Sequence, residues 1–97
     1  MAEEWTAGLA AEIDAELRAR AVPGRAAGEK AYLKSELTHY GASVPAMRGA
    51  VRAAMEGVAL DHDALVALVE ALWAEPVHER RAAAAERIYA AAIELIA

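Results

Sequence analysis

Residues 4–21, EWTAGLAAEIDAELRARA, carry a large apolar side chain at every fourth position. These side chains are Trp5, Leu9, Ile13 and Leu17. Residues four apart lie on one face of an α-helix, so the stretch predicts an amphipathic first helix with a single apolar stripe. Pro23 and Gly24 predict that this helix ends before them, because proline cannot continue the backbone hydrogen-bond ladder.

A second and a third helix are expected at about residues 26–37 and from Pro45 onward. Proline suits the first turn of a helix, where its missing N–H would have no partner. Ser43, just upstream, is a favourable cap for that end, and Gly41 is a natural left-handed residue after the second helix. The apolar contacts expected of the second helix are Tyr32, Leu33 and Leu37.

A fourth helix is expected after the N-cap residue Asp61, and a fifth from Pro76 to the last residue. No segment alternates apolar and polar residues as strands do, so the sequence predicts an all-α domain spanning residues 1–97. Short connections favour antiparallel helix hairpins, stacked as a HEAT-like α-solenoid or packed as a bundle. The residues expected in the core are Leu9, Ile13, Leu17, Leu68, Leu72, Ile88 and Ile93.

The amino-acid composition indicates in which cellular compartment the protein works. The chain has no cysteine, which excludes disulfides and thiolate chemistry. Its acidic N-terminus lacks the basic flank and apolar run of a signal peptide, and charged residues interrupt every apolar stretch before it could span a membrane. We therefore expect a cytoplasmic protein that does not contact membranes.

The charge of the chain is distributed unevenly. The net charge is −5, yet residues 25–52 hold five basic residues against two acidic ones. Within this segment, two pairs of basic residues are spaced four apart, so each pair lies on one helix face. These candidate phosphate contacts are Lys30, Lys34, Arg48 and Arg52. The segment is either an anion-binding face on an acidic body or ordinary surface variation.

Complete catalytic signatures are missing from the sequence. It has no glycine-rich phosphate loop, and its two serines have no neighbouring histidine in a nucleophile pattern. His39, His62 and His78 are far apart in sequence, and none has a partner at metal-ligand spacing on one helix face. We therefore expect no metal site, no cofactor and no catalytic residue in this chain.

The run from Ala31 to Arg48, AYLKSELTHYGASVPAMR, resembles the N-terminal part of AlkD-like DNA alkylation repair proteins. The matching positions are Tyr32, Leu33, Lys34, Tyr40, Gly41, Pro45 and Arg48. A second stretch, in which a tryptophan ends one helix and an acidic-basic pair opens the next, is also similar. Its positions are Leu72, Trp73, Pro76, Glu79, Arg80, Ala83 and Ala84, and the resemblance extends over about residues 5–97.

This resemblance implies a HEAT-like α-solenoid whose concave basic surface holds duplex DNA. Glycosylases of the family hydrolyse the N-glycosidic bond of alkylated purines without a metal or organic cofactor. Their catalytic aspartate lies in a tryptophan-rich segment, Trp-Trp-Asp followed by Val-Asp, which this sequence does not contain. The resemblance therefore carries no catalytic residue over to this chain, and we expect the chain alone to be inactive.

The C-terminal segment, IELIA at residues 93–97, lies in an apolar helix with no capping glycine and no polar final turn. This pattern predicts the N-terminal part of a longer solenoid, with an apolar stripe left uncovered at Ile88, Ala92, Ile93 and Ile96. Such a stripe favours self-association through the last helix. The alternative function is a helical protein–protein interaction module without enzymatic activity.

Overall fold

The computed structural model describes residues 2–96, and within them it contains helices and no strand. An isolated parallel β-bridge between Thr38 and Val77 is the one ladder contact in that range. The all-α class is therefore confirmed. The helices are α1 (Ala2–Ala19), α2 (Pro23–Leu33), α3 (Val44–Met55), α4 (His62–Ala74) and α5 (His78–Ile96).

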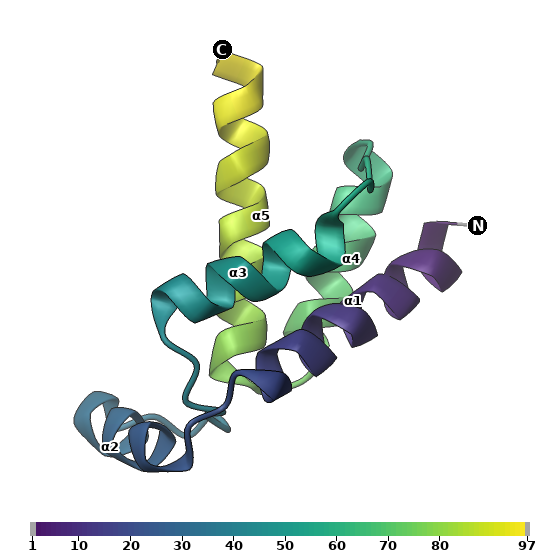
Figure 1. The fold of residues 1–97 in the computed structure, drawn as a ribbon. Helices are drawn as coiled ribbons and strands as arrows, with labels where there is room; N and C mark the ends of the chain where they lie inside the picture. Colours follow the sequence, from purple (N-terminus) through teal and green to yellow (C-terminus); the bar gives the residue numbers. More distant parts are fainter. Residues whose placement is uncertain (1, 97) are drawn as a thin grey trace.

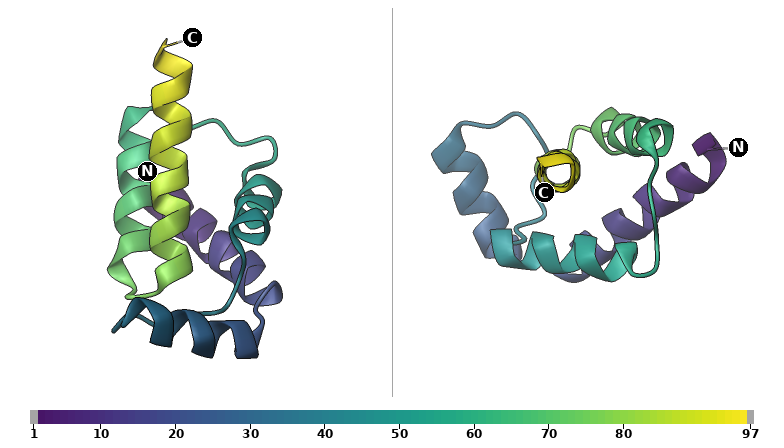
Figure 2. Two further views of the ribbon diagram at one scale, coloured as in Figure 1. Left: turned by 90° about the vertical axis from the view of Figure 1, so that its left-hand side faces the viewer. Right: turned by 90° about the horizontal axis from the view of Figure 1, so that it is seen from above.

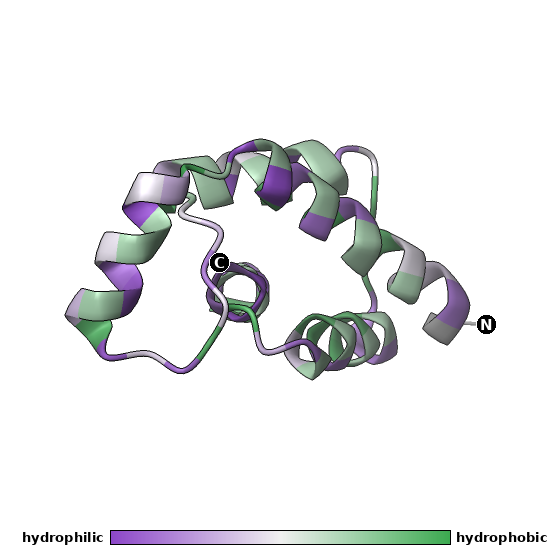
Figure 3. Cartoon of the chain, turned by 90° about the horizontal axis from the view of Figure 1, so that it is seen from below, coloured by the Kyte–Doolittle hydropathy of each residue, from purple (hydrophilic) through white to green (hydrophobic). Residues whose placement is uncertain are grey.

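The helices pack as two pairs (Figure 1). α1 lies against α3 and α4, and α4 lies against α5. The chain runs in opposite directions in α1 and α3, and again in α4 and α5. α2 interrupts the first pair and packs against no other described helix. Views along α5 place α2 and α4 on opposite sides of it (Figures 2 and 3). The arrangement agrees with a helical-repeat architecture.

The core forms where α1, α3, α4 and α5 meet. The stripe of α1 is confirmed, because Leu9, Ile13 and Leu17 are all buried. Leu68 and Leu72 of α4 are fully buried opposite that stripe, as the sequence predicts. Small residues complete the core and let the helix backbones approach closely. These small residues are Ala10, Ala50, Ala54, Ala83 and Ala84.

The expectation that Ile88 and Ile93 are buried is wrong. Their exposed fractions are 51% and 47%. Figure 2 shows the last turns of α5 extending past α4, and the C-terminal half of α5 contains no buried residue among those described. The buried side of α5 lies in its first turns, at residues 79–84. The separate expectation of an uncovered stripe is confirmed, because Ile88, Ala92, Ile93 and Ile96 are all exposed.

The second helix differs from its prediction at both ends. Pro23 occupies the first turn of α2 instead of only ending α1. α2 then ends at Leu33, because Lys34 adopts a left-handed conformation with φ of 50°. Tyr32 and Leu33 are 87% and 50% exposed, and residue 37 lies outside the helix, so the expected apolar contacts of α2 are not made.

The predicted caps of the next two helices are confirmed. The Ser43 hydroxyl accepts a hydrogen bond from the Ala46 N–H at 3.1 Å, and the Asp61 carboxylate accepts one from the Ala64 N–H at 2.8 Å. Gly41 has a φ of 86°, and a Cβ atom there would lie 2.2 Å from the carbonyl oxygen of Val22. The loop before α3 therefore requires glycine at this position. None of the described helices is long and apolar enough to cross a membrane.

Candidate nucleic-acid interface

The structure separates the four predicted phosphate contacts into two groups. Lys30 lies on α2 and Lys34 directly follows that helix. Because α2 does not pack against α3, these two cations do not form one edge with Arg48 and Arg52. The Lys30 ammonium donates to the Leu37 carbonyl at 2.5 Å and so closes the loop after α2. Lys34 serves as the C-cap residue of the same helix.

Arg48 and Arg52 lie together on α3, as their spacing predicts, and they line a cleft of about 730 Å³. Two further arginines line the same cleft, Arg20 after the end of α1 and Arg87 on α5. Neither is predicted from the sequence, because they join the first two arginines only through tertiary packing. We call this surface, lined by Arg20, Arg48, Arg52 and Arg87, the arginine cleft.

Two of the four cleft arginines are paired with carboxylates. Arg20 donates to the Glu16 carboxylate at 2.6 Å and to the Glu16 carbonyl at 3.0 Å. Arg48 lies 3.3 Å from a Glu86 carboxylate oxygen, and its side chain is 55% exposed. These pairs hold the guanidinium groups in place and partly neutralise them.

The other two cleft arginines have no carboxylate partner in the described part of the chain. Arg52 is exposed and forms no ion pair within residues 2–96. The Nε atom of Arg87 is buried and has no hydrogen-bond partner there. Guanidinium groups present several N–H donors in a planar fork that suits phosphate oxygens. The exposed Arg52 guanidinium therefore offers unpaired donors to an anion at the arginine cleft. Glu56 and Glu86 also line this cleft.

Several of the residues that carry the family resemblance form a polar cluster outside the arginine cleft. The Glu79 side chain is buried and accepts hydrogen bonds from the backbone N–H groups of Tyr40, Gly41 and Ala42, at 2.9, 2.9 and 3.2 Å. The Arg80 guanidinium donates to the carbonyl groups of residues 71 and 72 at the end of α4. The acidic-basic pair that opens α5 thus fixes the loop before α3 and the end of α4.

Asp14 joins this cluster to α1. The Tyr40 hydroxyl donates to Asp14 at 2.7 Å, Arg18 donates at 2.7 Å, and Arg80 lies 3.2 Å away. Burial alone would raise the pKa of Asp14, but these hydrogen bonds outweigh it and hold the pKa below its usual value. Burial and the hydrogen bond to Asp14 raise the pKa of Tyr40 to about 12. The cluster is a structural brace between α1 and α5, and it lies apart from the lining of the arginine cleft.

Comparisons with known proteins agree with this reading of the sequence. The family model described as DNA alkylation repair enzyme matches residues 13–95. No curated protein and no solved structure matches the chain. The family match includes α3, α4 and most of α5, together with the brace residues Asp14, Tyr40, Glu79 and Arg80. With most of its length matched, the chain belongs to the DNA alkylation repair enzyme family.

Proposed function

We propose that this chain is the N-terminal helical-repeat part of an AlkD-like DNA alkylation repair protein and that its arginine cleft contacts the phosphates of duplex DNA. The carrying observation is that Arg52 and Arg87 have no carboxylate partner within residues 2–96, although the chain as a whole is acidic. Phosphate contacts from arginine supply much of the affinity of a DNA-binding surface.

The charge of the rest of the chain supports one orientation on DNA. A net charge of −5 repels the phosphate backbone over most of the surface. The cleft has more basic than acidic side chains in its lining and is therefore the face that approaches the duplex. Lys30 is less suited to this role, because its ammonium already donates to the Leu37 carbonyl, and Lys34 does not line the cleft.

We assign DNA binding and hydrolysis of the N-glycosidic bond to different parts of the parent protein. In the parent protein the reaction is hydrolysis of the N-glycosidic bond of an alkylated purine, and a carboxylate stabilises the positive charge that develops on the sugar. These 97 residues contain no tryptophan-rich segment with that aspartate. We infer that the repeats described here bind and position DNA while a different segment performs catalysis.

Fluorescence anisotropy with a labelled duplex tests the assignment. At about 0.1 M salt, Arg52→Gln is expected to weaken binding about three- to tenfold, the effect of losing one phosphate contact. Lys34→Gln removes the same charge from the C-cap of α2 and is expected to leave affinity nearly unchanged. Equal losses in the two variants would show that only net charge matters, and stronger losses in Lys34→Gln would place the contact on α2.

A specific observation favours a second candidate, a helical interaction module. The C-terminal half of α5 exposes large apolar side chains with no cover among the described residues. Apolar surface of this kind is uncommon on a soluble monomer and usually has a partner. We propose a second copy of the chain as that partner, meeting α5 against α5. The exposed side chains are Ile88, Tyr89, Ile93, Leu95 and Ile96.

A further inference from the structure

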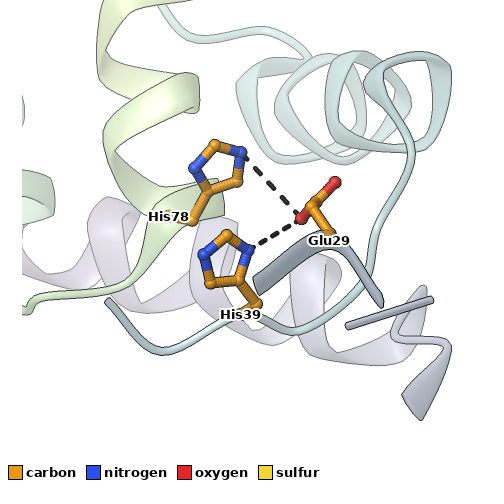
Figure 4. Close-up of side chains that lie close together, drawn as sticks. All are labelled: Glu29, His39 and His78. Carbon is orange, nitrogen blue, oxygen red and sulfur yellow. Dashed lines mark hydrogen bonds and ion pairs between the residues drawn. The ribbon is translucent and has the colours of Figure 1, made fainter. Parts of the chain in front are cut away.

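Three side chains with metal-binding chemistry meet below the first turn of α5 (Figure 4). Glu29 comes from α2, His39 from the loop before α3, and His78 is the first residue of α5. One ligand atom from each lies within 4.8 Å of the other two. The spacing of these residues in the sequence does not predict the cluster, because they are brought together only by the fold.

Backbone hydrogen bonds fix the positions of the two histidines. The Thr38 N–H donates to the Pro76 carbonyl at 2.9 Å, and the His78 N–H donates to the Thr38 carbonyl at 2.8 Å. The Glu79 carboxylate holds the next three residues after His39 through their N–H groups. The histidine positions are therefore set by the chain itself, before any ligand binds.

These backbone hydrogen bonds do not provide partners for the ring nitrogens of His39. Its side chain is only 1% exposed, and its Nδ1 lies 2.8 Å from a Glu29 carboxylate oxygen. Its Nε2 is buried with no hydrogen-bond partner in the described part of the chain. The nitrogen of this ring that can share a ligand with Glu29 is therefore Nδ1, which faces the carboxylate.

The second histidine faces the same carboxylate. The Nε2 of His78 lies 4.0 Å from the same Glu29 oxygen. Its ring stacks on that of His39, with 4.5 Å between centroids and 12° between planes. Figure 4 shows one nitrogen of each ring directed toward Glu29. Each imidazole thus directs one ring nitrogen, a possible metal ligand, toward the same carboxylate oxygen.

Two imidazoles and one carboxylate form a donor set that suits zinc and related divalent transition metals. We propose that Glu29, His39 and His78 bind one such ion. Two nitrogens on a tetrahedral zinc lie roughly 3.3 Å apart, given Zn–N bonds of about 2.0–2.1 Å. The stacked rings must therefore tilt toward each other. His78 can supply this movement, since its side chain is 36% exposed while that of His39 is enclosed.

The bound ion would fasten α2 to the body of the protein. α2 packs against no other described helix and has no buried residue. A metal shared by Glu29 and His78 would link α2 directly to the start of α5. Because the ion binds only the folded arrangement of ligands, it raises the stability of the fold. This inference is independent of DNA binding by the arginine cleft.

Titration of the chelator-treated, untagged full chain with Zn²⁺ tests the site. Isothermal titration calorimetry is expected to give one ion per chain, and Co²⁺ should give visible absorption bands of a nitrogen-ligated ion. Glu29→Gln and His78→Gln are each expected to lower Zn²⁺ affinity at least about tenfold, since even changes outside the ligand shell cause losses of that size. Both positions are partly exposed, and circular dichroism verifies that the variants keep their helices.

His62→Gln is the matched control, because it removes the remaining histidine, which is exposed at the start of α4. This variant is expected to bind Zn²⁺ like the wild type and to keep the rise in melting temperature on adding Zn²⁺. The proposal is overturned if the wild type binds no Zn²⁺. It is also overturned if His78→Gln binds as tightly as the wild type, which would leave the cluster as a histidine–carboxylate contact only.

Discussion

Glu79 is a buried carboxylate whose hydrogen-bond donors include three consecutive backbone N–H groups of one loop. Hydrogen bonds to a charged group are each stronger than neutral ones, and the donors would be left unpaired without it. The acidic-basic pair at the start of α5, Glu79 and Arg80, is therefore a determinant of the fold. Its place in the family resemblance reflects structure more than contact with DNA.

Glu79→Gln is expected to lower the free energy of unfolding by about 1.5–3 kcal/mol, because the amide keeps one acceptor oxygen and turns an NH₂ group toward backbone donors. Urea denaturation followed by circular dichroism measures this. Glu70→Gln, at an exposed position of α4, is the control and should change stability by less than about 0.5 kcal/mol. Equal stabilities of the two variants would contradict the role given to Glu79.

Tyr40 gives a pH-dependent prediction. Its pKa of about 12 in the folded protein lies above the value of about 10 in an unfolded chain, so the neutral phenol stabilises the fold. This contribution is complete below about pH 10 and is lost as the pH rises toward 12. The stability difference between the wild type and Tyr40→Phe should therefore shrink above about pH 10. A difference that stays constant up to pH 11, measured by urea denaturation, would refute the assignment.

At the scale of the helices, the sequence predicts which residues share a face better than it predicts what covers that face. The stripes of α1 and α4 are buried as expected because both helices lie in the centre of the packing. The same periodicity placed Ile88 and Ile93 in the core, where they are not. Periodicity shows which residues share a face of one helix, whereas the contacts that bury that face depend on how the helices pack together.

The sequence likewise predicts one part of the arginine cleft and not the other. Arg48 and Arg52 share a face because they are four apart, and the sequence shows this directly. Arg20 and Arg87 enter the cleft from other helices, and no spacing in the sequence reports their approach. The left-handed turn at Lys34, which redirects the chain after α2, was equally hidden, since lysine is not a typical residue for that conformation.

The exposed end of α5 predicts self-association. Sedimentation at several concentrations should show a dimer forming in the micromolar range, because pairing two α5 stripes removes apolar area from water. Ile93→Lys is expected to weaken the dimer. Val66→Lys, at an exposed apolar position on α4, is the control and should have no effect. A chain that remains monomeric throughout, with or without Ile93→Lys, would rule out this surface as a self-contact.

For the molecule as a whole, we propose that DNA binding and base removal belong to different segments. The purified chain, incubated with duplex DNA containing a methylated purine, is expected to release free base only at the spontaneous rate, because the catalytic aspartate segment is not among its residues. Chromatography of the released base measures this. Release clearly above that rate would show that a catalytic carboxylate lies within these 97 residues.

The salt dependence of duplex binding tests the central claim most directly. The logarithm of the binding constant falls with the logarithm of salt concentration by about 0.9 for each phosphate contacted. Arg52→Gln/Arg87→Gln is expected to flatten this slope by about 1–2 relative to the wild type. Arg25→Gln/Lys34→Gln removes the same charge from α2 and its C-cap and should leave the slope unchanged. A slope that flattens equally in both double variants, or only in the α2 variant, would contradict the assignment of the arginine cleft as the DNA interface.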